Sequence, residues 1–194
     1  MSTPQLWVLA GGNGAGKSTY YRLFLEPRGL PFINADMIAH RLAPDTPETH
    51  AYQAARIAAG LRDWLLRQQS SFCFETVFSH PSKIDFVADA KGLGYEVVLV
   101  FIHLDTDMLN QARVAQRVSE GGHGVPTEKI IQRIPRTAAH IAKVLPLVDR
   151  ARLYDNSSAS APFQPVADIN HGQMTVHQTP LPDWANSLVS QIVR

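Results

Sequence analysis

The sequence lacks the usual marks of a secreted or membrane protein. A single cysteine, Cys73, stands in an apolar segment, so no disulfide can form within the chain and a buried, unreactive thiol is expected. No apolar run approaches the length that spans a bilayer, and the N-terminus has no basic-then-apolar signal pattern. These absences predict a cytoplasmic protein without a membrane partner.

The chain also lacks an excess of either charge. Its net charge is +1 and 18% of its residues are charged, so charge gives no reason to expect a nucleic-acid partner. No internal repeat or low-complexity tail is present, and no guanine-reading N-K-x-D segment occurs. A GTPase switch is therefore disfavoured, although no adenine-reading motif selects ATP over GTP either.

What the sequence does contain is a regular alternation of apolar strands and helices. A chain of 194 residues is expected to form one domain, 1–194. The predicted strands are residues 6–10, 30–36, 71–78, 95–104 and 151–157. The predicted helices are residues 17–25, 47–68, 82–92 with Gly92 as its C-cap, 106–119, 127–146 with an interruption near Pro135, and 182–193.

This alternation predicts an α/β fold with a parallel five-stranded sheet flanked by helices. Residues 162–178 are expected to form a C-terminal β-hairpin that turns near His171 and Gly172, so the hairpin and the last helix occupy about 162–193. In the helix at 47–68, one side is expected to be apolar, and it consists of Ala51, Ala54, Ala55, Ala58, Leu61, Trp64 and Leu65. Parallel sheets bind ligands at the carboxyl ends of their strands, which selects the candidate site residues.

A glycine-rich segment follows the first strand and matches the phosphate-loop pattern G-x-x-x-x-G-K-[ST]. Glycines let backbone N–H groups point at phosphate oxygens, and the helix that follows adds the positive end of its dipole. Lys17 can reach the outer phosphates, and the Ser18 hydroxyl can ligate Mg²⁺. The segment predicts binding of ATP with Mg²⁺ through Gly11, Gly12, Asn13, Gly14, Ala15, Gly16, Lys17, Ser18 and Thr19.

Two carboxylates lie near the ends of the next two strands. Asp36 is a candidate for the base that takes a hydroxyl proton during phosphoryl transfer, and it can equally be a helix N-cap. Glu75 interrupts an apolar strand, and a buried carboxylate without a partner costs several kcal/mol. It is assigned to substrate or metal-water contacts, with an ion pair to a helix residue as the alternative.

Polar residues also follow the third and fourth strands. Thr76, Ser79, His80 and Lys83 are candidates for lining an acceptor pocket, although such residues are more often loop and cap residues. Asp105 ends a segment that superficially resembles a Walker B strand, and capping of the next helix is the favoured interpretation.

Residues 110–136 contain five basic and two acidic residues around the glycine-rich stretch EGGHGVP. Arg113 and Arg117 share a helix face, and Arg133 and Arg136 follow the stretch. A lid that closes cations over the phosphates is expected here, with Arg117 and Arg133 as the phosphate contacts. A solvated basic helix face is the alternative.

Several of these motifs together resemble the zeta-toxin family of P-loop kinases, in a compact bacterial branch. The motifs are GGNGAGKST (11–19), FINADMIA (32–39), FETVFSH (74–80), RVSEGGHGVP (117–126) and RLYDNS (152–157). The resemblance implies a P-loop kinase fold and phosphorylation of UDP-N-acetylglucosamine on a sugar hydroxyl, with an antitoxin protein as a partner. It further implies that Lys17 binds phosphate, Asp36 is the base, Glu75 contacts the substrate and lid arginines, among them Arg117, contact ATP.

The predicted function is therefore ATP-dependent phosphorylation of a small-molecule hydroxyl, with a nucleotide sugar as one candidate acceptor. Two alternatives remain open at this stage: a kinase for another metabolite or for a nucleic-acid end, and a non-catalytic ATP-binding regulatory module.

Overall fold

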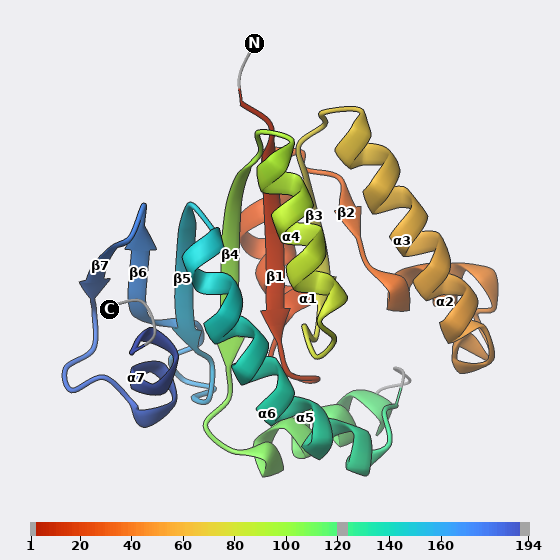
Figure 1. Cartoon of the computed structure of the whole chain (residues 1–194). Coiled ribbons are helices and arrows are strands. Elements are labelled where there is room, and N and C mark those ends of the chain that lie inside the picture. Colours follow the sequence, from red (N-terminus) through yellow and green to blue (C-terminus); the bar gives the residue numbers. More distant parts are fainter. Residues whose placement is uncertain (1–2, 120–123, 191–194) are drawn as a thin grey trace.

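The computed structural model describes residues 3–119 and 124–190, and it contains one seven-stranded sheet in the order β2-β3-β1-β4-β5-β6-β7 (Figure 1). The strands are β1 (Gln5–Gly11), β2 (Phe32–Ile33), β3 (Phe72–Thr76), β4 (Glu96–His103), β5 (Arg150–Asp155), β6 (Gln164–Asn170) and β7 (Gln173–Val176). The first five strands pair in parallel, as predicted. The C-terminal hairpin also forms as predicted, and it extends the same sheet in antiparallel pairing.

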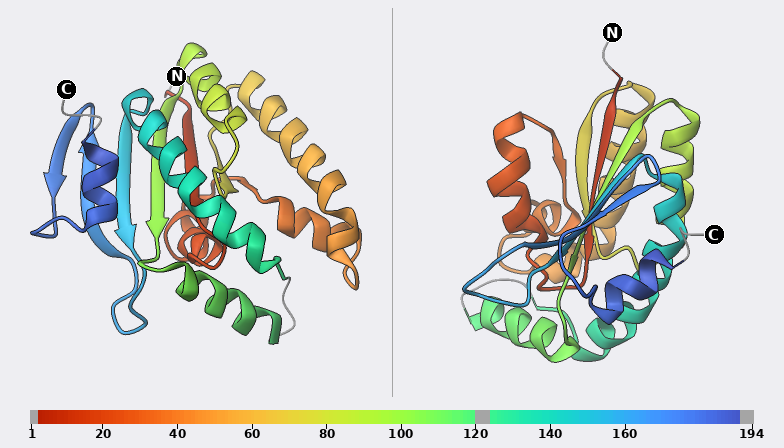
Figure 2. Two further views of the ribbon diagram at one scale, coloured as in Figure 1. Left: turned by 60° about the horizontal axis from the view of Figure 1, so that its bottom comes forward. Right: turned by 90° about the vertical axis from the view of Figure 1, so that its left-hand side faces the viewer.

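The helices cover both faces of this sheet. They are α1 (Lys17–Tyr20), α2 (Ala35–Leu42), α3 (Ala51–Arg67), α4 (Ser82–Gly92), α5 (Asp107–Ser119), α6 (Thr127–Val144) and α7 (Asp183–Val189). Figure 2 shows α1 on one face, and α4, α6 and α7 on the other. Among the described residues, no helix combines the length and the apolarity that crossing a bilayer requires.

Alternation along β1 explains why the sheet has two buried faces. Leu6, Val8 and Ala10 belong to the core cluster that includes residues of α3, α4, α6 and α7. Trp7 and Leu9 belong to the second cluster, with residues of α1 and the turn after it. Successive side chains of a strand point to opposite faces, so a strand buried on both sides reads as a continuous apolar run. Cys73 of β3 is fully buried, as predicted.

The strand order reverses at β1, which has β3 on one side and β4 on the other. In open α/β sheets this switch point opens a crevice at the carboxyl ends of the strands. The phosphate-loop segment leaves β1 at that crevice, and Asp36 and Glu75 lie at the ends of the two strands beside it. The topology therefore brings together residues that are far apart in the sequence.

The predicted second strand and first helix have different bounds in the structure. Strand pairing covers only Phe32–Ile33, because the Asn34 side chain accepts hydrogen bonds from the N–H groups of Asp36 and Met37 and starts α2. The α-helical part of the first helix ends at Tyr20 and is followed by a π turn (Tyr21–Leu25) and, beyond the predicted end at residue 25, by a 3₁₀ turn (Glu26–Arg28). Pro27 fits the start of that last turn, where its missing N–H group is not needed.

Two capping predictions were wrong. Gly92 remains helical, and the left-handed residue that ends the turn is Gly94, with φ +84°. Asp105 does not cap α5: the Thr106 hydroxyl accepts the hydrogen bond from the Leu109 N–H group, and the Asp105 N–H group donates to Ser157 Oγ. In both cases the chain uses a neighbouring residue of suitable chemistry, which sequence spacing alone cannot distinguish.

Two predictions about long helices also need correction. The helix α6 is continuous through Pro135, because buried residues on both sides, among them Ile130 and Ile141, hold it against the rest of the protein. In α3, Ala54, Ala58 and Leu65 are buried as predicted, but Trp64 is 58% exposed and Leu61 39% exposed. Figure 1 shows α3 at the edge of the sheet, beside the short strand β2, where little covers its outer side.

A partly buried ion pair joins three elements near the opposite end of the sheet from the crevice. The Lys91 ammonium of α4 donates to both carboxylate oxygens of Asp149 at 2.6 and 2.7 Å, and the Val97 N–H group of β4 donates to Asp149 Oδ2 at 2.7 Å. Burial raises the pKa of the Asp149 carboxyl, but the hydrogen bonds from Lys91 and Val97 outweigh it, so the pKa is lowered. The ionised carboxylate therefore stabilises the fold.

We expect Asp149→Asn to lower the free energy of unfolding by about 1–3 kcal/mol at pH 7, because it removes hydrogen bonds to a charged acceptor. A carboxyl group with a lowered pKa contributes stability above its unfolded-state pKa and loses it as the pH falls through the folded-state value. The difference between wild type and variant should therefore shrink between about pH 7 and about pH 3 in urea denaturation. Asp89→Asn on the exposed side of α4 is the control, and an equal loss in both variants at every pH would contradict the assignment.

Candidate active site

The loop between β1 and α1 curls in a way that requires glycine. Gly11, Gly14 and Gly16 have φ values of +152°, +77° and +95°. A Cβ atom on Gly11 would lie 2.3 Å from the Ile102 carbonyl oxygen of β4, and one on Gly14 would lie 2.9 Å from the Asn110 carbonyl oxygen. The glycines of the predicted phosphate loop are therefore needed both for their backbone conformation and for close packing.

Two buried asparagines hold the loop from outside. The Asn110 amide of α5 donates to the Asn13 carbonyl oxygen at 2.6 Å, and the Asn156 amide, just after β5, donates to the Ala15 carbonyl oxygen at 2.9 Å. These two hydrogen bonds fix the curled backbone of the loop, a conformation in which successive N–H groups can bind an anion. Neither asparagine was predicted as a site residue, although Asn156 lies in the RLYDNS motif.

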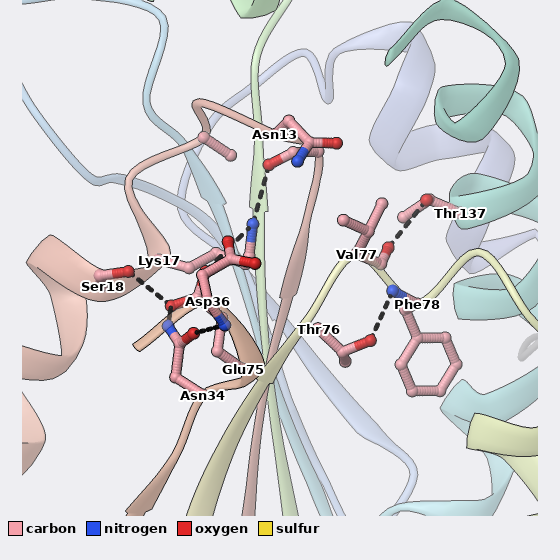
Figure 3. Close-up of polar contacts among 12 residues, drawn as sticks. Asn13, Lys17, Ser18, Asn34, Asp36, Glu75, Thr76, Val77, Phe78 and Thr137 are labelled. Atoms are coloured by element: carbon pink, nitrogen blue, oxygen red, sulfur yellow. Dashed lines mark hydrogen bonds and ion pairs between the residues drawn. The ribbon is translucent and has the colours of Figure 1, made fainter. Parts of the chain in front are cut away.

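The Glu75 carboxylate is the centre of a polar network at the end of β3. It accepts hydrogen bonds from Ser18 Oγ at 2.6 Å and from Asn34 Nδ2 at 2.8 Å, and it lies 3.6 Å from the Lys17 ammonium (Figure 3). Lys17, which is 5% exposed, also donates to the Gly12 carbonyl oxygen at 2.9 Å. The alternative for Glu75, an ion pair with a helix residue, is thus what the structure contains, and its helix partner is the phosphate-loop lysine.

Asp36 lies in the first turn of α2, and Asn34 provides the N-cap of this helix. The N-cap role that was an alternative prediction for Asp36 is therefore taken by Asn34, two residues earlier. Figure 3 shows the side chains of Lys17, Asp36 and Glu75 pointing toward one another. The three groups that the prediction required to meet do share one space.

That space is a cavity of about 680 Å³. Its walls include the phosphate loop, the ends of β3 and α2, and parts of α3, α5 and α6. The lining residues from the predicted site are Asn13, Gly14, Gly16, Lys17, Ser18, Thr19, Asp36, Glu75, Thr76, Arg117 and Arg133, whereas Gly11, Gly12 and Ala15 of the predicted loop do not line it. A phosphate cradle and two carboxylates in one cavity are what a phosphoryl-transfer site requires.

The helices α5 and α6 bring arginines to the same cavity. Arg113, Arg117 and Arg133 line it, whereas Arg136 does not. Arg113 donates to the carbonyl oxygen of Asn156, the residue that holds the loop from outside, at 2.7 Å. Arg133 Nη1 donates to Oδ1 of Asn13 in the phosphate loop at 3.5 Å. Of the glycine-rich stretch between these helices, residues 120–123 lie outside the described part of the chain.

The predicted acceptor residues divide into two groups. Thr76 and Lys83 line the cavity, whereas Ser79 and His80 do not. His80 Nδ1 accepts from the Ser82 N–H group at 3.2 Å and so stabilises the start of α4. Arg62 of α3 also lines the cavity, and sequence reasoning missed it because its helix position gives no sign that it faces a ligand.

The residues present fit a magnesium nucleotide. The buried Lys17 ammonium and the curled loop suit phosphate oxygens, and the Ser18 hydroxyl lies beside the Glu75 carboxylate. Among residues 3–119 and 124–190 no group of three or more His, Cys, Asp or Glu residues is placed to hold a metal ion by itself. Mg²⁺ fits such a site because it commonly takes one or two protein oxygens and completes its shell with phosphate and water.

Asn156 offers a test of the loop's support. We expect Asn156→Asp to weaken ATP binding about tenfold, because the variant loses the donor to the Ala15 carbonyl oxygen and leaves a buried acceptor unpaired. Calorimetric titration with ATP measures this effect, and Asn170→Asp on the exposed hairpin is the control. Unchanged affinity in a folded Asn156→Asp protein would show that the loop does not depend on this contact.

Comparison with known proteins agrees with this geometry. A protein of Haemophilus influenzae that is described as uncharacterised is 32% identical over 140 residues, which are 69% of this chain and 99% of that protein. The structure of the PezAT chromosomal toxin–antitoxin system of Streptococcus pneumoniae is similar with a TM-score of 0.66 and 15% identity, over 99% of this chain and 87% of that chain.

The complex of AvrRxo1-ORF1 and AvrRxo1-ORF2 with ATP is similar with a TM-score of 0.66 and 18% identity, over 97% of this chain and 64% of that chain. The chain thus spans less than two thirds of the AvrRxo1 relative's length. These structural similarities show that the chain has the fold of P-loop kinases. The family model described as Zeta toxin matches residues 1–163, and the chain therefore belongs to the zeta-toxin family.

Proposed function

We propose that the protein is a kinase that transfers the γ-phosphoryl group of ATP to a hydroxyl group of a small-molecule acceptor. The observation that carries this proposal is the single cavity that contains Lys17, Asp36 and Glu75. UDP-N-acetylglucosamine is one candidate acceptor, through the family resemblance. An antitoxin protein is the corresponding candidate partner, since the PezAT relative is described as a toxin–antitoxin system.

In this proposal each lining residue has a chemical role. Asp36 takes the proton of the acceptor hydroxyl. At the same time the hydroxyl oxygen of the acceptor forms a bond to the γ-phosphorus of ATP, and the bond between that phosphorus and the β-phosphate oxygen of the leaving ADP breaks. Lys17 exchanges its contacts with Glu75 and the Gly12 carbonyl oxygen for phosphate oxygens. Arg117 and Arg133 neutralise the charge that develops during transfer.

Ser18 and Glu75 are the residues that would hold Mg²⁺, directly or through water, and the ion would supply positive charge that offsets the negative charge of the phosphates. Glu75 and Thr76 of β3 also line the cavity, and in this proposal they contact the acceptor. The hydrogen bonds that Glu75 accepts from Ser18 and Asn34 orient its carboxylate for either contact.

We expect Lys17→Ala to weaken ATP binding at least about tenfold, because it removes the charged donor that reaches the phosphates. Equilibrium binding with a fluorescent ATP analogue is the measurement. Lys143→Ala on the exposed side of α6 should bind like wild type. Equal affinity of the Lys17→Ala and wild-type proteins would rule out the phosphate loop as the nucleotide site.

We expect Asp36→Asn to bind ATP nearly normally but to lose phosphoryl transfer by about 10²–10⁴-fold, since the amide cannot accept the proton. The assay uses labelled ATP, Mg²⁺ and a panel of hydroxyl compounds that includes UDP-N-acetylglucosamine. Asp45→Asn, which is exposed and outside the cavity, is the control. Transfer that survives in Asp36→Asn would remove Asp36 as the base, and ATP binding without turnover on any acceptor would favour the regulatory module.

A further inference from the structure

The wall of the cavity formed by α3 has an unusual composition. Ala51, Ala55 and Ala58 lie four and three residues apart, and Arg62 follows four residues later, so the four residues share one face of the helix. All four line the cavity. The small alanine side chains leave open volume along this wall, and the stripe ends at a guanidinium group.

Arg62 is held in place by aromatic rings rather than by an acidic partner. Its guanidinium carbon lies 5.2 Å from the centre of the Phe74 ring and 5.5 Å from that of Phe86. Its Nε atom is buried without a hydrogen-bond partner, and within the described part of the chain no ion pair joins Arg62 to a carboxylate. Burial lowers the pKa of Arg62, and the negative charge of the adjacent Asp63 opposes this only in part.

Lys83 lies in the same cavity at a position that is unfavourable for a cation. It is the second residue of α4, where the positive end of the helix dipole repels an ammonium group. Burial lowers the pKa of Lys83, the charge of Arg62 lowers it further, and Asp63 again opposes the shift. Lys83 is thus a cation at the start of a helix, where an acidic residue is preferred, and a second cation, Arg62, also disfavours its charge. Such an unfavourable arrangement is expected at a functional site.

We propose that Arg62 and Lys83 together bind an anionic group, a carboxylate or a phosphate, on the phosphoryl acceptor. This inference rests on the proposed kinase function and specifies its substrate class: a hydroxy compound that carries its own negative charge. The fixed plane of a guanidinium group suits two parallel hydrogen bonds to an oxyanion, and Lys83 adds a second donor.

The charges of the cavity support a second anion besides the nucleotide. Seven cationic side chains line it, against three carboxylates, Asp36, Glu48 and Glu75. The phosphate loop with Arg113, Arg117 and Arg133 provides the cations for the nucleotide phosphates. Arg62 and Lys83 come instead from α3 and α4, which follow β2 and β3, the side of the crevice from which Asp36 also comes. An anion held there fixes the rest of the acceptor within the cavity that contains the proposed base.

The first test measures anion binding without phosphoryl transfer. The full chain is saturated with Mg²⁺ and a non-hydrolysable ATP analogue, which fills the phosphate loop including the γ position. Inorganic phosphate is then titrated at constant ionic strength by calorimetry. We expect one further phosphate site in wild type, and at least about tenfold weaker binding in Arg62→Met and in Lys83→Met, which each lose a charged donor. Arg67→Met, exposed on the same helix, should bind like wild type.

A second measurement separates this role from a structural one. Because the charge of Arg62 acts unfavourably on Lys83, removing the lysine charge relieves this repulsion, so Lys83→Met should raise Tm by about 2 °C or more in the absence of anions. A lysine that stabilises the fold would give a lower Tm on substitution. Arg62→Lys keeps the charge but loses the planar donor pair, and it should retain only part of the phosphate affinity.

The outcomes distinguish the inference from the function on which it rests. Phosphate binding that is equal in wild type, Arg62→Met and Lys83→Met, or absent in a wild type that binds the ATP analogue, overturns the anion site alone. Failure to bind the analogue overturns the proposed kinase. Competition of acetate against phosphate, followed by transfer assays with glycerol, glycerate and glycerol 3-phosphate, shows whether the site prefers a carboxylate or a phosphate.

Discussion

The Glu75 carboxylate is the contact on which the arrangement of the site depends. It joins Lys17 and Ser18, at the start of α1, to Asn34, at the start of α2, and it does so from the end of β3. A carboxylate at such a partly buried position must have partners, because an uncompensated charge there costs several kcal/mol. The same partners that satisfy Glu75 orient the phosphate-loop lysine and place the helix that carries Asp36.

The loop itself is held from the opposite side by uncharged groups. Asn110 and Asn156 donate hydrogen bonds to the carbonyl oxygens of Asn13 and Ala15, so the backbone of the loop is held in a defined arrangement. Phosphoryl transfer relies on positioning and electrostatic stabilisation more than on covalent chemistry, so such preorganisation is what the proposed kinase activity requires. Arg113 also donates to the Asn156 carbonyl oxygen, next to the contact of Asn156 with the loop.

Much of this could be anticipated from the sequence because the signals are local. The phosphate loop needs glycines at fixed positions, and the strands that are buried on both faces need continuous apolar runs. The structure confirms the predicted succession of strands along the chain and the hairpin near His171 and Gly172. It also confirms that Lys17, Asp36 and Glu75 line one cavity. The errors at Asp105, Gly92 and Pro135 concern helix ends and helix continuity, where neighbouring residues compete on nearly equal terms and packing decides.

The sequence by itself determined the α/β fold, the phosphate loop and the family, since each depends on residue types at short, fixed spacings. Only the tertiary structure decided which partners surround those residues. Asn110 and Asn156 contact the loop although they are about a hundred residues or more away from it along the chain. Arg62 and Lys83 line one cavity only because α3 and α4 both border it. The physical reason is that the carboxyl ends of strands far apart in the sequence lie together at one edge of a parallel sheet. A local sequence pattern does not show which side chains are neighbours at that edge.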